Sequence, residues 1–234
     1  MNILSTTLRN ILLLGPLSGM ASGMASGAVF FTTWNSGFDN SGIVPDGNPL
    51  GWSDTRVITG LAGASITDIT VSLSVTGGYN GDLYVYLQHD SGISILLNRP
   101  GRTATDAFGY ADSGFNVTFN DSAPNGDSHV NFTGSSILAG TPWQPDGRAT
   151  DPAIVVDTNP GTDLLSSFDG FTPTGDWTLF VADMSGGDTS NSQVTSWGLE
   201  LTAVPEPCEV TALALLIGSS LFLRTRPRQR KVGS

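Results

Sequence analysis

The sequence of 234 residues predicts an all-β fold, a β-sandwich or a barrel, and two observations support this prediction. First, four stretches alternate apolar and polar residues with a period of two, which is typical of strands that bury one face. These stretches are 69–75, 83–88, 177–182 and 197–202. Second, the residues between them are rich in Gly, Ser, Asp and Asn, which favour turns over helices. Many short strands joined by polar turns indicate a sandwich or a barrel.

The chain begins with the pattern of a secretory signal peptide, residues 1–28. Arg9 is the only charged residue among the first 38. An apolar stretch at 11–17 follows it, and then small residues lead to the expected cleavage between Ala28 and Val29. We therefore expect the middle of the chain to be exported.

The exported part divides into residues 29–54, an N-terminal extension or first strand, and residues 55–203, the sandwich. Shorter strands are expected at 56–59, 93–97, 115–119 and 154–156, and residues 120–152 are expected to form a loop. Residues 29–207 contain 20 of the 21 acidic residues and only four of the ten basic ones, all arginines, so their net charge is −16. This charge disfavours nucleic acid as a partner. The single cysteine, Cys208, excludes an intramolecular disulfide.

The last thirty residues consist of three parts. Residues 204–207 read Val204-Pro205-Glu206-Pro207, and their prolines predict an extended, accessible segment outside any central strand. The run Val210–Leu223 carries no charge, and residues 208–223, which include Glu209, predict a transmembrane helix about 24 Å long at about 1.5 Å per residue. Residues 224–231 form a basic stop, which predicts a cytoplasmic end. The cations of this stop are Arg224, Arg226, Arg228, Arg230 and Lys231.

This three-part tail resembles the PEP-CTERM sorting signal of exported proteins in Gram-negative bacteria. The resemblance implies processing by an exosortase-type enzyme near residues 204–207. It also implies transient retention in the inner membrane, followed by release or attachment at the cell surface. Proteins with this signal accompany exopolysaccharide production, so a role in a matrix or biofilm follows by analogy.

The order of the strands resembles a proprotein-convertase P domain over about residues 55–202. The matching motifs are Gly81-Asp82-Leu83-Tyr-Val-Tyr-Leu87 and Gly175-Asp-Trp177-Thr-Leu-Phe-Val181-Ala-Asp183. A closing strand, Trp197-Gly-Leu199-Glu-Leu201, follows them. The resemblance implies a jelly-roll sandwich that usually accompanies a subtilase.

Calcium is the site hypothesis that we derive from the turns. Asp82, Asp183 and Asp188 fall at predicted strand ends, and calcium binds several oxygens from Asp, Asn and backbone carbonyls. The alternative is that these aspartates accept hydrogen bonds from turn amides.

No residue is assigned a catalytic role. The only histidines, His89 and His129, read as ordinary surface residues. The sequence therefore predicts an exported, non-enzymatic protein of the cell surface or extracellular matrix. One alternative is a carbohydrate-binding module that uses Tyr79, Tyr84 and Tyr86 to stack on sugars. Another is an accessory domain of a protease system or a hydrolase.

Overall fold

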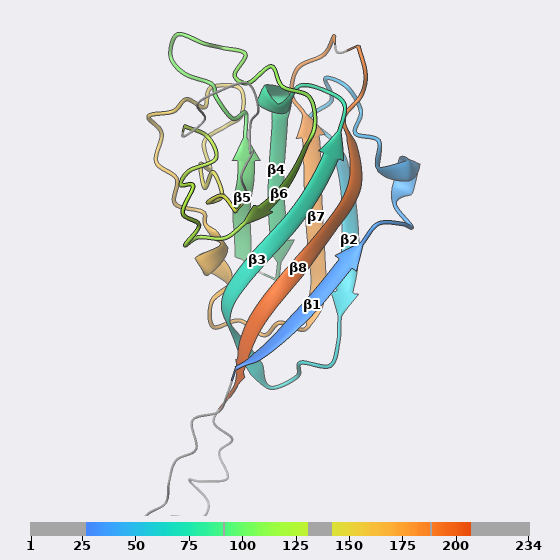
Figure 1. Cartoon of the computed structure of the whole chain (residues 1–234), viewed down its shortest axis with the longest axis vertical. Helices are drawn as coiled ribbons and strands as arrows, with labels where there is room; N and C mark the ends of the chain where they lie inside the picture. Colours follow the sequence, from blue (N-terminus) through green and yellow to red (C-terminus); the bar gives the residue numbers. More distant parts are fainter. Residues whose placement is uncertain (1–26, 91, 131–141, 188, 207–234) are drawn as a thin grey trace, which may run out of the picture.

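Eight antiparallel strands form two facing sheets of four strands each (Figure 1). The computed structural model describes residues 27–90, 92–130, 142–187 and 189–206. One sheet has the order β1-β8-β3-β6 and the other has the order β2-β7-β4-β5. The strands are β1 (Ala28–Trp34), β2 (Trp52–Ile58), β3 (Ala64–Thr76), β4 (Leu83–His89), β5 (Gly92–Asn98), β6 (Phe115–Phe119), β7 (Gly175–Asp183) and β8 (Gln193–Pro205).

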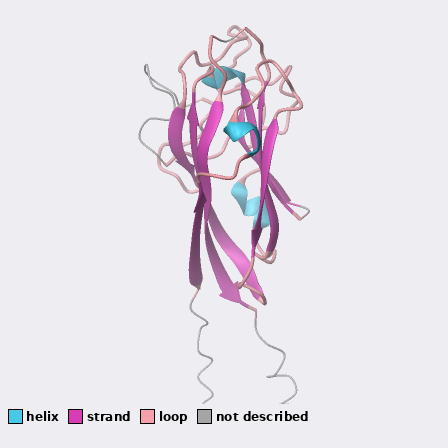
Figure 2. Cartoon of the chain, turned by 90° about the vertical axis from the view of Figure 1, so that its right-hand side faces the viewer, coloured by secondary structure: helices cyan, strands magenta, loops and turns pink. Residues whose placement is uncertain are grey.

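The chain passes from one sheet to the other at almost every connection. Among the described strands, only β4 and β5 follow each other in the same sheet, where they form a hairpin. This is the strand order of an eight-stranded jelly roll. Figure 2 shows that the helical segments are short pieces in the connections. They are η1 (Asp39–Gly42), η2 (Asn80–Asp82) and η3 (Leu165–Phe168).

The core lies between the sheets and uses the apolar face of each alternating strand. Trp177 of β7 and Trp197 of β8 are both fully buried, as their positions in the pattern predicted. The Trp197 indole donates a hydrogen bond to Asp54 of β2 over 2.7 Å, so it also links the two sheets. The Trp177 indole donates to the carbonyl of Pro173 over 3.0 Å.

The four predicted alternating stretches all lie in strands, namely β3, β4, β7 and β8. Residues 93–97 and 115–119 also lie in strands. The expected strand at 154–156 is wrong, because Ile154 and Val155 turn back to hydrogen-bond the carbonyl of Asp151. The expected strand at 56–59 begins four residues earlier, at Trp52, and ends at Ile58.

In the sequence, the sandwich extends beyond the expected range 55–203 at both ends. Residues 29–54 include most of β1, which pairs with β8 from Ala28↔Ala203 to Trp34↔Trp197. At the other end, β8 continues into the motif to Pro205, which lies opposite Ala64.

A proline is tolerated at the end of β8 because of the direction in which its nitrogen points. The Glu206 amide donates to the carbonyl of Gly63, so in an antiparallel ladder the preceding nitrogen faces away from β3. Val204 and Pro205 are therefore extended, as expected, but they belong to a central strand. This corrects the expectation that prolines would exclude them from one.

The flanking signals lie outside the described residues. This applies to residues 1–26, to Pro207, to the expected helix 208–223 and to the basic stop 224–231. Within the part of the chain that the structure describes, no helix has the length and apolar character needed to cross a bilayer.

The core arrangement predicts the cost of removing either tryptophan. In a domain of residues 27–206, Trp177→Ala or Trp197→Ala should lower the free energy of unfolding by about 3–5 kcal/mol, because each leaves a large cavity. Val57→Ala is the control, since Val57 on β2 is 66% exposed, and it should change stability by no more than about 0.5 kcal/mol. Urea denaturation measures all three changes. Equal stability of the tryptophan variants and the control would contradict this core.

Candidate functional site

The aspartates that were expected to bind calcium meet at one end of the sheet that contains β4 and β7. Asp183 lies opposite Leu83 in the β4–β7 ladder, and the Met184 amide donates to the carbonyl of Asp82 over 2.8 Å. Asp183 is fully buried and accepts a hydrogen bond from the Ser185 amide. Asp188, the third candidate, lies outside the described residues. The structure thus brings Asp82 and Asp183 together.

A protein cation already neutralises part of this carboxylate pair. Arg99 donates to Asp82 over 2.8 Å and to the carbonyl of Gly81 over 2.7 Å, and only 7% of Arg99 is exposed. Burial lowers the pKa of the Arg99 guanidinium, and the charge of Asp82 opposes that shift. Asp82 is therefore the ion-pair partner of Arg99 as well as a turn residue.

Calcium stays a prediction. Within residues 27–90, 92–130, 142–187 and 189–206, no three His, Cys, Asp or Glu side chains gather as a metal-binding group. Two adjacent carboxylates suit calcium, but Arg99 holds one of them.

Beside Asp82, the end of the sandwich is hollowed into an open cleft of about 300 Å³. Its lining comes from three segments: the turn before β4, the loop between β5 and β6, and the turn after β7. The lining residues are Tyr79, Asp82, Phe108, Gly109, Tyr110, Ala111, Ser185, Gly186 and Gly187. Three aromatic residues therefore line one concave surface together with Asp82, Ser185 and three glycines.

Glycine allows the cleft wall to form. A β-carbon on Gly81 would lie 2.4 Å from the carbonyl oxygen of Phe108 and 2.6 Å from the amide of Tyr110. Because Gly81 lacks that atom, its amide donates to the carbonyl of Tyr110 over 2.8 Å. The loop that carries Phe108 and Tyr110 is thereby held against the turn that carries Tyr79.

Local hydrogen bonds fix the aromatic rings further. Asp106 accepts from the amides of Phe108 and Gly109 over 3.0 and 3.2 Å, which shapes the turn that presents the Phe108 ring. The Tyr110 hydroxyl donates to the carbonyl of His129 over 2.9 Å. Phe108 is 79% exposed and Tyr79 is 41% exposed, so both rings are accessible to a ligand.

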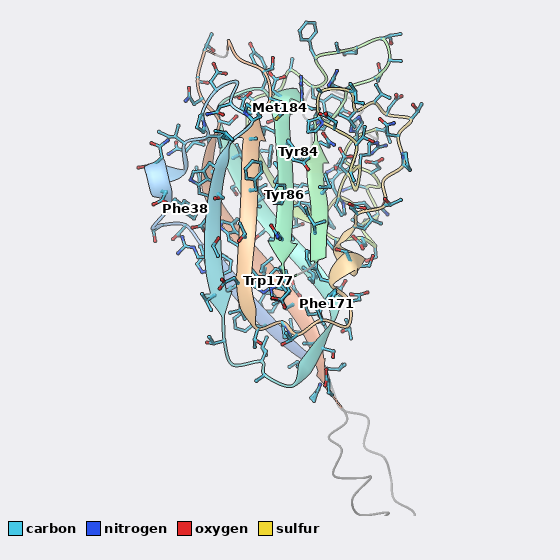
Figure 3. All side chains as sticks on the ribbon, turned by 180° about the vertical axis from the view of Figure 1, so that it is seen from behind. Phe38, Tyr84, Tyr86, Phe171, Trp177 and Met184 are labelled. Carbon is cyan, nitrogen blue, oxygen red and sulfur yellow. The ribbon has the colours of Figure 1, made fainter. Side chains whose placement is uncertain are left out.

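The other two tyrosines expected to bind sugar, Tyr84 and Tyr86, lie on the outer face of the sheet that contains β4 and do not line the cleft. Figure 3 shows Tyr84 and Tyr86 along β4 and Met184 at the end of the sheet. Met184 directly precedes Ser185, which lines the cleft. Tyr86 stacks on Phe180 with ring centroids 4.7 Å apart, and Tyr84 contacts both rings. Burial is the largest cause that raises the pKa of both tyrosines. Their rings pack mainly against one another.

Sequence reasoning missed a buried ionic network in the loop after β6. His129 Nδ1 lies 2.8 Å from an Asp146 carboxylate oxygen, and His129 Nε2 lies 2.9 Å from the carbonyl oxygen of Arg102. Arg148 pairs with the same Asp146 over 3.1 Å and with Asp127 over 2.9 Å. His129 and Asp146 are each 1% exposed, so neither is the surface residue that the polar sequence suggested.

The network favours a charged His129. Both ring nitrogens face acceptors, and only a doubly protonated imidazole donates to both. Burial alone would lower the pKa of His129, but the hydrogen bond and charge of Asp146 outweigh it, and the net shift is upward.

His89 is also buried, contrary to the expectation of a surface histidine. It is 1% exposed, and its ring stacks on Trp177 with centroids 4.0 Å apart. Its nitrogens lie within 2.9 Å of the carbonyl oxygens of Asp176 and Thr172. Both histidines are therefore parts of the interior.

Comparison with protein families and with curated proteins finds no match to this sequence. Among solved structures, the chain is similar to one in the complex of an Aeromonas sobria serine protease with its chaperone, at 15% identity and a TM-score of 0.44. That match covers 79% of this chain and 28% of the other. The serine protease of Aeromonas sobria solved without the chaperone gives 14% identity, a TM-score of 0.40, and coverage of 75% and 27%. The chain spans less than a third of the length of both.

The raised pKa of His129 predicts a pH dependence of stability. The charged ring should contribute fully below its unfolded pKa of about 6.5, and the contribution should fade as the pH rises through the higher folded pKa. We expect the free energy of unfolding to fall over that window and His129→Gln to flatten the fall. Asp176→Asn, which changes an exposed carboxylate, is the control and should leave the fall in the free energy of unfolding unchanged. Equal slopes in wild type and His129→Gln, or a folded pKa below 6.5 by NMR titration, would refute the charged ring.

Calcium has its own test. Millimolar calcium is expected to raise the melting temperature, because an ion bound only by the folded state stabilises that state. Asp183→Asn should abolish the rise, whereas Asp176→Asn, at the opposite end of β7, should keep it. Identical melting curves in calcium and in chelator would leave Arg99 as the cation of this site.

Proposed function

We propose that this chain is an exported, non-enzymatic protein of the cell surface or extracellular matrix that binds polysaccharide. The observation that carries the proposal is the open cleft in which Tyr79, Phe108 and Tyr110 share one concave surface. The cleft lies at one end of a β-sandwich, where turns between strands commonly form binding sites.

The chemistry of the cleft suits sugars. A pyranose ring has apolar C–H faces that pack on aromatic rings and hydroxyl groups that need hydrogen-bond partners. Ser185 and the backbone of Gly109 and Gly186 supply polar groups beside the rings. The volume of about 300 Å³ accommodates a short stretch of a chain, and the open shape lets the chain continue beyond it.

The cleft serves this function better than the outer-face tyrosines do. The Tyr86 and Phe180 rings are nearly parallel, with an interplanar angle of 16°, so each covers a face of the other. A sugar stacks on a ring face, and this contact already covers one face of Tyr86 and one of Phe180, whereas Tyr79 lines the cleft itself. Tyr79 is therefore the residue of the expected sugar-binding set that we assign to the site.

The histidines support a binding role over a catalytic one. A hydrolytic triad needs a histidine that reaches both a nucleophile and the substrate. The ring nitrogens of His89 and His129 lie against carbonyl oxygens or against Asp146, and both side chains are buried. Neither ring is placed at the cleft.

We further propose that the chain is exported through its signal peptide and processed at residues 204–207 by an exosortase-type enzyme. Every described strand lies between Ala28 and Pro205. Cleavage before Val29 and after Pro207 would therefore release the sandwich with nearly all of its paired residues. This geometry is compatible with the sorting signal that the tail resembles.

Sugar binding predicts a specific loss of affinity. On a glycan array, and then by calorimetry, residues 27–206 should bind oligosaccharides, and Tyr79→Ala should weaken binding about tenfold or more, because it removes an aromatic face on which the sugar packs; a tenfold loss corresponds to about 1.4 kcal/mol. Tyr86→Ala is the matched control from the outer face and should bind as wild type does. An array without hits would overturn the proposal, and so would equal loss in both variants.

Processing predicts the mass of the mature protein. In the native host, the exported species should begin near Val29 and end near residues 204–207, which intact-mass spectrometry measures directly. Pro207→Ala should slow the conversion and leave a membrane-associated precursor. A mature envelope species that still carries Arg224–Lys231 would exclude the sorting signal.

A further inference from the structure

We infer that the cleft selects a cationic sugar chain, a polymer of amino sugars with free amines, over neutral and acidic polysaccharides. This inference rests on the proposed function, because it names the substrate class of the same cleft. Its basis is that accessible aromatic rings lie next to carboxylates, while each arginine of the described residues is already bound to other groups of the protein.

Four carboxylates lie in the cleft lining or accept hydrogen bonds from its backbone amides. Asp82 lines the cleft itself. Asp46 accepts from the Gly187 amide over 3.0 Å, and Asp183 accepts from the Ser185 amide over 3.1 Å. Asp106 accepts from the amides of Phe108 and Gly109. Asp82 is paired with Arg99 and Asp183 is fully buried, so the exposed carboxylates held beside the lining are those of Asp46 and Asp106.

Each arginine in the described residues already has partners within the protein. Arg99 is used by Asp82 and the Gly81 carbonyl, and Arg102 donates to the carbonyl of Pro152. Arg148 is buried against Asp127 and Asp146, and Arg56 pairs with Asp54 on β2. The domain has no lysine. A uronate or sulfated chain would therefore meet repulsion at the cleft without a compensating cation.

An ammonium group gains from both features of the cleft. The faces of Tyr79, Phe108 and Tyr110 are electron-rich, and cations bind such faces. The surrounding carboxylates add a longer-range attraction, which raises the local concentration of a cationic chain and weakens with salt. An N-acetyl group on the same sugar keeps the stacking but removes the charge. The free amine is thus the group that the site distinguishes.

The experiment compares four oligosaccharides of equal length on residues 27–206. They are glucosamine with free amines, N-acetylglucosamine, glucose and glucuronate. We expect the free-amine oligomer to bind about tenfold more tightly than the N-acetylated one at low salt, and this advantage to shrink by about half or more on a logarithmic scale in 0.5 M NaCl. Glucuronate should bind most weakly.

Charge-neutral variants test the source of the selectivity. Asp46→Asn and Asp106→Asn keep an amide oxygen that accepts the same backbone hydrogen bonds and remove the charge. Together they should reduce free-amine binding several-fold and leave N-acetylglucosamine binding unchanged. Asp176→Asn is the matched control, an exposed aspartate at the far end of β7, and should change neither.

The outcomes separate this inference from the proposed function. Equal binding of the amine and N-acetyl oligomers would overturn the selectivity and leave sugar binding in place. Failure of all four would overturn both. Oligolysine of matched charge distinguishes a sugar site from general attraction of cations: if it binds as tightly as the amino sugar and Tyr79→Ala does not weaken it, the inference is wrong.

Discussion

The pairing of β3 with β8 is the interaction on which the rest of the structure depends. The two strands, 13 residues each, are the longest that the structure describes, and they pair from Ala64↔Pro205 to Thr76↔Gln193. β8 also carries β1 on its other side, so one sheet is complete only when the last strand has joined it. The inner face of β8 brings Trp197 and Leu201 into the core. Loss of β8 would therefore leave β1 without a partner and expose the opposite sheet.

Buried ionic groups stabilise the part of the molecule that has the least regular structure. The segment around residues 146–163 runs beside β5, where Ile95 exchanges hydrogen bonds with Gly147 and Asp163. This contact covers the edge of β5, which would otherwise be free to pair with another chain. Asp146 anchors the segment through His129 and Arg148. Buried ion pairs of this kind are costly to break singly, because the remaining charge has no partner.

The sequence predicted those features that a short period encodes. Alternating residues identified β3, β4, β7 and β8 because each buries one face, and this local pattern does not depend on the partner strand. It failed for β1, whose residues are all exposed or half-buried at the edge of a sheet. It also failed at Ile154, because an Asp151 turn has the same apolar residues as a short strand. Asp82 and Asp183 could be placed near each other because each lies at the end of a predicted strand. Asp82 directly precedes β4, and Asp183 is the last residue of β7. The cleft and the His129 network join residues far apart in sequence, so no local pattern indicated that Phe108 would face Tyr79 or that Asp146 would be buried.

The ends of the described chain and the cleft lie at opposite ends of β3. Ala64, where β3 begins, lies beside Pro205, whereas Thr76, where it ends, leads directly to Tyr79. Thirteen residues of strand separate them, which is roughly 40 Å at about 3.3 Å per residue. β1 begins at the same end as Pro205, since Ala28 lies opposite Ala203. A sandwich attached to a surface through the residues after Pro205 would therefore be held at one end and carry its aromatic cleft at the other, about the length of β3 from the point of attachment.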